Sequence, residues 1–324
     1  MITTRSAPRP AAALLAVIAV AATATACSSG GEKAGGDRAT QPAMEQSAVP
    51  EAGKAEEKDA TIGLVLPIDA YDVSADQIVR TGQALNLLNK QCLSRFGLQQ
   101  ERLPASTVVE GSPHTRRYGT PASLDIAQKY GFHMPQGDPR AFTSDQMVRQ
   151  PTAVVEVLRG MKDGSGEPVT TYNGMKVPEG GCAKESQRTL ANGADTRAGH
   201  AETASAIRTR SFETAKRDPR VTAAEKQWAG CMAAKGYSAY KSPFDAIGDP
   251  KWSAPKATPE EIETAVASWA CGKEANIVGT WVTVETAYQQ TQITQNAEKL
   301  KQEQKTLETE AKRLDAIITA AGTQ

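Results

Sequence analysis

Residues 228–236 read WAGCMAAKG, a helical stretch that carries a cysteine and ends at a glycine. Residues 92–97, CLSRFG, repeat this spacing, because in both stretches a glycine follows the cysteine five residues later. A second matched motif lies downstream of each, CAKE at 182–185 and CGKE at 271–274. We therefore expect two copies of one helical unit, each braced by a pair of cysteines.

Four cysteines other than Cys27 are available for disulfides: Cys92, Cys182, Cys231 and Cys271. An even number in an exported protein predicts disulfide bonds, and three pairings are possible. The repeated motifs favour Cys92 with Cys182 and Cys231 with Cys271. A zinc site needs closely spaced ligand pairs, whereas these cysteines are far apart and the chain has only three histidines, so we expect no metal and no cofactor.

The first 26 residues predict a signal peptide. Arg5 and Arg9 precede an apolar run over 11–22, and small residues then lead to Ala24-Thr25-Ala26-Cys27. The apolar run is shorter than the roughly 20 residues that a membrane-spanning helix needs. The ending resembles a lipobox and predicts lipidation of Cys27. The alternative is ordinary cleavage near Ala26, which would leave Cys27 as a free thiol.

The lipidated Cys27 and a disordered tether are expected to make up residues 27–60. This stretch is rich in Gly, Ala, Glu, Lys and Pro and has almost no large apolar side chains, so it cannot bury enough surface to offset its ordering entropy. It would hold the folded part roughly 30 Å from the membrane. Removing residues 1–26 leaves 35 basic and 37 acidic residues, a balance that makes nucleic acid an unsuitable partner.

The composition favours a mostly α fold, with few aromatic residues and abundant alanine. Ser74 with Gln77, and Thr258 with Glu261, predict two helix starts through capping boxes. Further helices are expected over 120–131, 154–158, 202–216 and 220–235. Asn173-Gly174 predicts a small β-hairpin within 164–181, and a β-branched run over 61–66 is a candidate strand.

We expect an α-rich globular domain over 61–283 with two Cys-paired subunits, 75–190 and 202–283, followed by one long helix over 284–320. That helix has a heptad seam, formed by Ile293, Ala297, Leu300, Gln304, Leu307, Ala311, Leu314 and Ile318. The seam either packs back on its own domain or forms a homodimer or binds a protein partner.

One polar cluster is a candidate ligand pocket: His114, Arg116, Arg117, Tyr118 and His133 bracket the helix expected over 120–131. If these side chains converge, they offer donors for a phosphate, a carboxylate or a sugar acid. The alternative is that Arg117 and Tyr118 have packing roles and that both histidines lie at the surface. The cluster holds no nucleophile, and the chain has no hydrolase or nucleotide-binding motif, so we assign no catalytic residue.

Several motifs together resemble a family of uncharacterised actinobacterial extracytoplasmic lipoproteins with paired Cys-Met/Leu-x-x-x-Gly motifs. Besides the lipobox, they are Arg116-Arg117-Tyr118-Gly119, Tyr130-Gly131-Phe132-His133, the stretch Val177 to Cys182 and the stretch Trp228 to Met232. The likeness spans most of residues 75–290. It implies secretion and two disulfides, and no established activity.

These features favour a cell-envelope lipoprotein, anchored on the outer face of the cell membrane, with a non-enzymatic binding or scaffolding role. One alternative is the extracytoplasmic solute-binding component of a transporter, which would have two α/β lobes. Another is an envelope hydrolase that uses His133 or the neighbouring acids Glu260 and Glu261. These two acids also fit the first turn of a helix, where the dipole favours negative charge.

Overall fold

The computed structural model describes residues 50–101, 114–135 and 149–322. The expected signal peptide, Cys27 and the tether up to residue 49 lie outside the described residues. All of the described residues belong to one compact unit, Ser47–Gln324. Among the residues described, no helix combines the length and the apolar character needed to cross a membrane.

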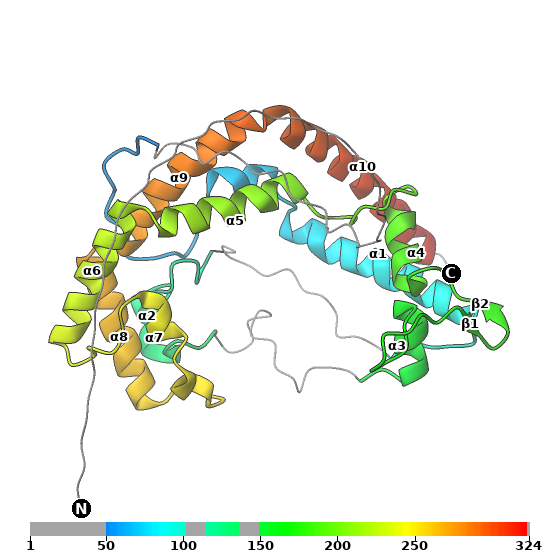
Figure 1. The fold of residues 1–324 in the computed structure, drawn as a ribbon, viewed down its shortest axis with the longest axis horizontal. Helices are drawn as coiled ribbons and strands as arrows, with labels where there is room; N and C mark the ends of the chain where they lie inside the picture. Colours follow the sequence, from blue (N-terminus) through cyan, green and yellow to red (C-terminus); the bar gives the residue numbers. More distant parts are fainter. Residues whose placement is uncertain (1–49, 102–113, 136–148, 323–324) are drawn as a thin grey trace, which may run out of the picture. The chain divides into compact units, whose positions relative to one another are not determined.

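The described chain is mostly α, as expected, and Figure 1 shows its helices. The α-helices are α1 (Ala75–Ser94), α2 (Leu124–Tyr130), α3 (Thr152–Arg159), α4 (Gly181–Leu190), α5 (Glu202–Lys216), α6 (Pro219–Ala234), α7 (Pro243–Ile247), α8 (Pro259–Glu274), α9 (Ile277–Gln295) and α10 (Ala297–Gly322). Two 3-10 helices, η1 (Pro67–Tyr71) and η3 (Pro250–Ser253), and two short strands, β1 (Thr171–Tyr172) and β2 (Met175–Lys176), complete the list.

The expected hairpin is present and small. Strands β1 and β2 pair antiparallel, Thr171 with Lys176 and Tyr172 with Met175. The turn residues Asn173 and Gly174 have φ values of 47° and 76°, the left-handed backbone that an Asn-Gly hairpin turn requires.

Ser74 and Thr258 are the N-caps of α1 and α8, so both helices begin where the sequence predicts them. The Ser74 side chain accepts a hydrogen bond from the Gln77 N–H at 3.1 Å, and that of Thr258 accepts from the Glu261 N–H at 3.2 Å. The helix expected over 120–131 instead begins at Leu124, with Ser123 as its N-cap. The reason is that the Ala122 carbonyl accepts from the Thr61 N–H at 3.1 Å, which holds this residue outside the helix.

The candidate strand over 61–66 is wrong. This segment makes a turn, in which the Leu64 N–H donates to the Thr61 carbonyl at 3.2 Å, and then leads into η1. The Thr61 hydroxyl donates to the Thr115 carbonyl at 2.7 Å. The backbone and side chain of Thr61 thus bind a loop, and β-branched residues here do not pair with a neighbouring strand.

The cysteines form the two pairs that the repeated motifs predict. Cys92 near the end of α1 bonds to Cys182 in the first turn of α4, and Cys231 on α6 bonds to Cys271 on α8. The Cα atoms of each pair are 5.6 Å apart. Each bond closes a long loop and restricts the unfolded chain, which is worth on the order of 4 kcal/mol.

Each disulfide lies beside its own hydrophobic core. The larger core combines residues of α6, α7, α8 and α9, and its central side chains are fully buried Trp228 and Trp281. The smaller core surrounds Cys92 and Cys182 and takes its other members from α1, α3 and the segment before α4.

The residues of the expected subunit 75–190 do not share a single hydrophobic core. Its residues Tyr118, Ala127 and Phe132 belong to the larger core, with α6, α8 and α9. The physical reason is aromatic packing, because the ring centroids of Tyr118 and Trp281 are 5.1 Å apart and those of Phe132 and Trp252 are 5.9 Å apart. Helix α2 accordingly contacts α8 of the other expected subunit.

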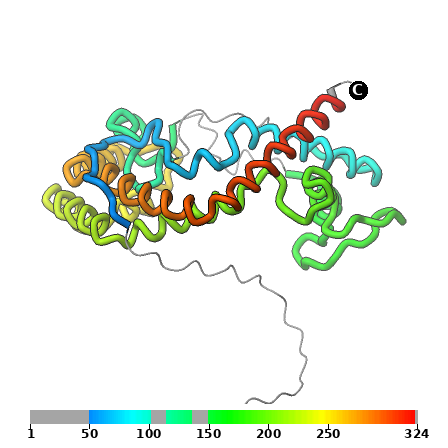
Figure 2. Tube along the Cα trace, turned by 90° about the horizontal axis from the view of Figure 1, so that it is seen from above, coloured from blue at the N-terminus to red at the C-terminus, as the bar shows by residue number. Residues whose placement is uncertain are grey.

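The helix expected over 284–320 is divided in two. Helix α9 ends at Gln295, Asn296 has φ −114° and ψ 17°, and α10 begins at Ala297. The long C-terminal helix of the prediction is α10. Figure 2 shows α10 crossing beside α1.

The heptad seam is occupied within the chain. Leu300, Leu307 and Leu314 of α10 are all buried. The first two pack with Ile68 of η1 and Ile207 of α5, and Leu314 packs with Ala84 of α1 and Leu190 of α4. In the described chain, the seam therefore packs back on its own domain, which is the first of the two alternatives.

We expect Leu300→Ala to lower the free energy of unfolding by about 3 kcal/mol, because it removes a fully buried side chain and leaves a cavity. Urea unfolding of the disulfide-bonded protein measures the loss. Lys301→Ala, at the neighbouring exposed position, is the control and should change stability by less than about 0.5 kcal/mol. Equal losses in both variants would contradict the burial of the seam.

Candidate functional site

The five residues of the predicted polar pocket do not converge on a single site. Arg117 and Tyr118 bind Glu285 on α9, His114 binds Asp69 in η1, and His133 binds Glu261 on α8. Arg116 is exposed. Four of the five side chains that we expected to bind a ligand therefore bind three separate acids of the protein itself.

Glu285 has no exposed side-chain surface. Arg117 Nε lies 3.1 and 3.0 Å from its two carboxylate oxygens, and Arg117 Nη2 also donates to it. The Tyr118 hydroxyl donates to Oε2 at 3.0 Å, and Gln289 Nε2 donates to Oε1 at 3.0 Å. The carboxylate is thus charge-paired and well supplied with donors, as a buried charge must be.

Burial and the adjacent charge set the pKa values in this group. Burial, followed by the negative charge of Glu285, raises the pKa of Tyr118 well above its ordinary value. Burial alone would lower the pKa of Arg117, but the hydrogen bonds and charge of Glu285 raise it above its ordinary value. Both side chains keep their protons at neutral pH and act as donors.

His114 is a buried partner of a carboxylate. Its Nε2 lies 2.9 Å from Asp69 Oδ2, and the same oxygen accepts from the Leu66 N–H at 2.7 Å. Burial alone would raise the pKa of Asp69, but the hydrogen bonds from His114 and Leu66 outweigh it and lower the pKa. This pair fixes the start of η1 against the 114–118 segment.

His133 has both ring nitrogens engaged. Nδ1 lies 2.7 Å from Glu261 Oε1, and Nε2 lies 2.7 Å from the Ala254 carbonyl oxygen. The Phe132 N–H donates to the same Glu261 oxygen at 2.8 Å. A general base needs a ring nitrogen that can reach a substrate proton, whereas Nε2 here faces a backbone acceptor. The geometry fits a role in holding α2, η3 and α8 together.

Glu261 lies in the first turn of α8, as the sequence suggests, and it is buried there. Its side chain has no exposed surface and points at α2. Gly131 permits this approach, because a Cβ atom at that position would lie 2.7 Å from Glu261 Oε1. Sequence reasoning named Glu261 only as one of a pair of acids and missed Asp69 and Glu285. For Glu285 a signal existed, since it lies on one helical face with Trp281 and Tyr288.

A pocket lies elsewhere, between α1, the end of α3 and the start of α4. Its volume is about 430 Å³. Charged side chains line part of it: Arg159, Lys184, Arg188 and Asp195. Its other lining residues are Leu85, Asn89, Met161, Gly180, Ala183, Gln187 and Thr196. We call this the basic pocket.

The basic pocket has the chemistry of a binding site. Three of its side chains are cations, and its only carboxylate is that of Asp195. Asp195 Oδ1 lies 3.7 Å from Lys184 Nζ and 3.4 Å from Arg188 Nε. No histidine or cysteine lines it. It therefore offers positive charge and donors, but lacks the nucleophile and base pair that turnover needs.

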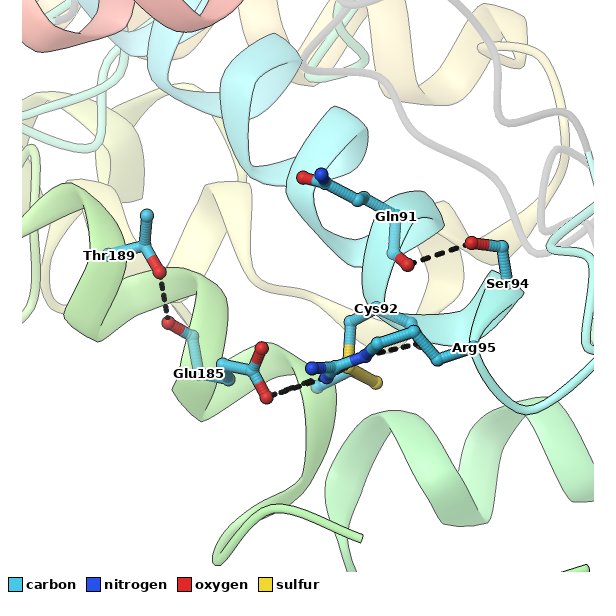
Figure 3. Close-up of a disulfide and its surroundings, with 7 residues drawn as sticks. Gln91, Cys92, Ser94, Arg95, Glu185 and Thr189 are labelled. Atoms are coloured by element: carbon cyan, nitrogen blue, oxygen red, sulfur yellow. Dashed lines mark hydrogen bonds and ion pairs between the residues drawn. A yellow bond between two sulfur atoms is a disulfide. The ribbon is translucent and has the colours of Figure 1, made fainter. Parts of the chain in front are cut away.

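A smaller pocket of about 220 Å³ lies beside the Cys92–Cys182 bond. Figure 3 shows its charged residues, Arg95 and Glu185, whose side chains pair at 2.7 Å next to the sulfur atoms. Because each charge already has its partner, this pocket offers little to a ligand. In the described ranges, no group of three or more His, Cys, Asp or Glu side chains could hold a metal ion.

A further buried acid lies at the start of α6. Asp218 caps the helix by accepting from the Arg220 N–H at 2.9 Å, and its carboxylate also accepts from Arg220 Nη2 at 2.7 Å and the Tyr288 hydroxyl at 3.3 Å. The hydrogen bond from the Arg220 side chain is the main reason that the pKa of Asp218 is lowered.

We expect Glu285→Gln and Arg117→Met each to lower the free energy of unfolding by about 3 to 5 kcal/mol, because each leaves a buried charge without its partner. The double variant should lose less than the sum of the two, since both charges are then absent. Urea unfolding measures all three. Glu213→Gln is the control, because it breaks an exposed ion pair with Arg217 at 3.7 Å and should cost less than about 0.5 kcal/mol. Additive losses would contradict direct pairing.

We expect Asp218→Asn to lower stability by about 1 kcal/mol at pH 7. The pKa of Asp218 is lower in the folded protein than its ordinary value of 3.8. The carboxylate's contribution is thus present above pH 3.8 and disappears as the pH falls through the lower folded value. Urea unfolding over a pH series should show the variant and wild type converging in acid. Exposed Asp163→Asn is the control, and a difference that is constant with pH would contradict the assignment.

Comparisons of the chain with protein-family models, with curated proteins and with solved structures gave no match. The function is therefore argued from the sequence and from the geometry of the described residues.

Proposed function

We propose that the chain is a lipoprotein of the cell envelope, anchored through Cys27 on the outer face of the cell membrane, with a non-enzymatic binding role. The leader over residues 1–26, the lipobox ending and the polar tether support the location. Two disulfides in the folded part fit an oxidising compartment outside the cytoplasm.

The basic pocket is the observation that carries the binding role. It is open, about 430 Å³ in volume, and lined by three cations against one carboxylate. The candidate catalytic groups lie elsewhere and are bound to internal partners, His133 to Glu261 and to the Ala254 carbonyl. A pocket with charge and no base favours binding over turnover.

The two alternatives have less support. A transporter's solute-binding component would need two α/β lobes, whereas the strands of the described residues are two residues long. A hydrolase centred on His133 would need Nε2 to be free for a substrate or a nucleophile, and Nε2 lies 2.7 Å from a backbone carbonyl oxygen.

A scaffolding role through 284–320 also has less support than binding. The apolar seam residues of α10 pack on η1, α5, α1 and α4. A second copy or a protein partner would have to use the charged outer face of α10 or displace one of these helices. The homodimer or partner at 284–320 stays a prediction.

We expect Cys27→Ser to abolish anchoring, because serine has no thiol to carry the lipid. In a bacterial host fed an alkyne fatty acid, the wild-type protein should carry the label and enter the detergent phase, and the variant should do neither. Cys231→Ser with Cys271→Ser is the control, because it removes the two cysteines of one disulfide while leaving Cys27. Label that persists in Cys27→Ser would contradict the proposed anchor.

A further inference from the structure

Two charged side chains of the basic pocket lie one helical turn apart on α4. Lys184 and Arg188 occupy positions i and i+4, and their side chains are 36% and 37% exposed. Positions spaced in this way share a helix face. Arg159, at the end of α3, is the third cation of the wall and has no ion pair with any described residue.

Close backbone packing brings Arg159 to this wall. A Cβ atom at Gly160 would lie 2.4 Å from the Gly181 nitrogen, so only a glycine lets the end of α3 meet the start of α4. Gly160 and Gly181 both have positive φ values, 67° and 74°, which glycine adopts without strain. The two glycines thus set a cation of one helix beside those of the next.

Helix α4 adds its own positive end to the pocket. Its N-cap, Gly180, has no side-chain cap and lines the pocket. The first N–H groups of a helix lack intrahelical acceptors and carry the positive end of the helix dipole. Gly180 and Lys184 both line the pocket, so the N-terminal turn of α4 borders it and favours an anion there.

Asp195 marks where an anion would bind. Its carboxylate bridges Lys184 and Arg188 but is 69% exposed. Lys184 also lies 3.9 Å from the exposed Glu179. Exposed pairs of this kind contribute about 1 kcal/mol or less, so an external anion with more charge can displace the Asp195 carboxylate.

Part of the pocket wall is apolar. Leu85 of α1, Ala183 of α4 and Met161 line it, and Met161 is 47% exposed. Asn89 also lines the pocket, and its Oδ1 is buried with no hydrogen-bond partner. An apolar wall next to three cations suits a ligand with one charged end and one apolar end.

We propose that the basic pocket binds a phosphate group that bears an apolar substituent. The lining has three cations and one carboxylate, and Glu179 lies 3.9 Å from Lys184, so the cations still outnumber the acids and the pocket favours an anion such as a phosphate monoester. Two of the cations are arginines, whose forked donors fit phosphate oxygens. The inference rests on the proposed binding function and adds the class of ligand. Its source is either a membrane lipid headgroup or a soluble phosphate ester.

The test uses the Cys27→Ser protein, purified without detergent, and calorimetric titration. The probe is dihexanoyl phosphatidic acid, with inorganic phosphate, octanoate and dihexanoyl phosphatidylcholine for comparison. We expect phosphatidic acid to bind most tightly. Arg159→Gln should weaken it about fivefold, and Asp195→Asn should tighten it about fivefold, because each alters one exposed charge contact. Lys305→Gln, an exposed cation on α10, should have no effect.

Opposite effects at Arg159 and Asp195 support the pocket and would not arise from a loss of folding, which lowers binding in both variants. Equal binding of octanoate would overturn the phosphate assignment. Equal binding of phosphatidylcholine, a phosphodiester, would overturn the preference for a phosphate monoester. Equal binding of inorganic phosphate would show that the apolar substituent does not contribute to binding, and would overturn that part of the proposal. If phosphatidic acid binds neither to the wild-type pocket nor to Asp195→Asn, the proposed binding site is wrong.

Sedimentation with vesicles identifies the source. If the Cys27→Ser protein, but not the same protein carrying Arg159→Gln, sediments with vesicles of phosphatidylcholine and phosphatidic acid, the ligand is a lipid headgroup. Binding of the short-chain probe alone indicates a soluble ester.

A thermal-stability screen with neutral sugars and amino acids separates this inference from the proposed function. If a neutral ligand raises the melting temperature and phosphatidic acid does not, the binding role stands and the phosphate class is wrong. If nothing binds in either experiment, both are wrong.

Discussion

A carboxylate without exposed surface, that of Glu285, ties the larger core together. It accepts from Arg117 and Tyr118 in one segment and from Gln289 on its own helix. Arg117 also donates to the Arg208 carbonyl on α5 at 2.9 Å. Because a buried charge is costly unless it is paired, α9, α5 and the 114–118 segment can pack around it in few ways. This constraint places Tyr118 against Trp281 and draws residues 114–133 into the core of α6, α8 and α9.

Local signals in the sequence predicted much of the fold. Capping residues such as Ser74 and Thr258 act on the backbone within three positions, so they identify where α1 and α8 begin. The disulfide pairing followed from the repeated motifs around Cys92 and Cys231. The Asn173-Gly174 turn was predictable for the same local reason, since it depends on the backbone preferences of two residues.

Long-range partners were not predictable in the same way. His133 and Glu261 are 128 positions apart, and Arg117 and Glu285 are 168 apart. The sequence indicated that the polar cluster was unusual but not that each member has its own internal acid. The basic pocket was missed for a similar reason: Arg159, Lys184 and Asp195 come from different segments, and the approach of Gly160 to Gly181 brings them together.

The buried leucines of α10 fix a distance within the fold. Leu300 packs in the cluster with η1 and α5, and Leu314 packs in the cluster with α1 and α4. At 1.5 Å of rise per residue, these two anchor points are about 21 Å apart along the helix. The length of α10 between these two leucines thus sets the distance between the two clusters. A one-residue insertion between the anchors would rotate the later one by about 100°, so the length of this segment constrains the protein as strongly as its composition.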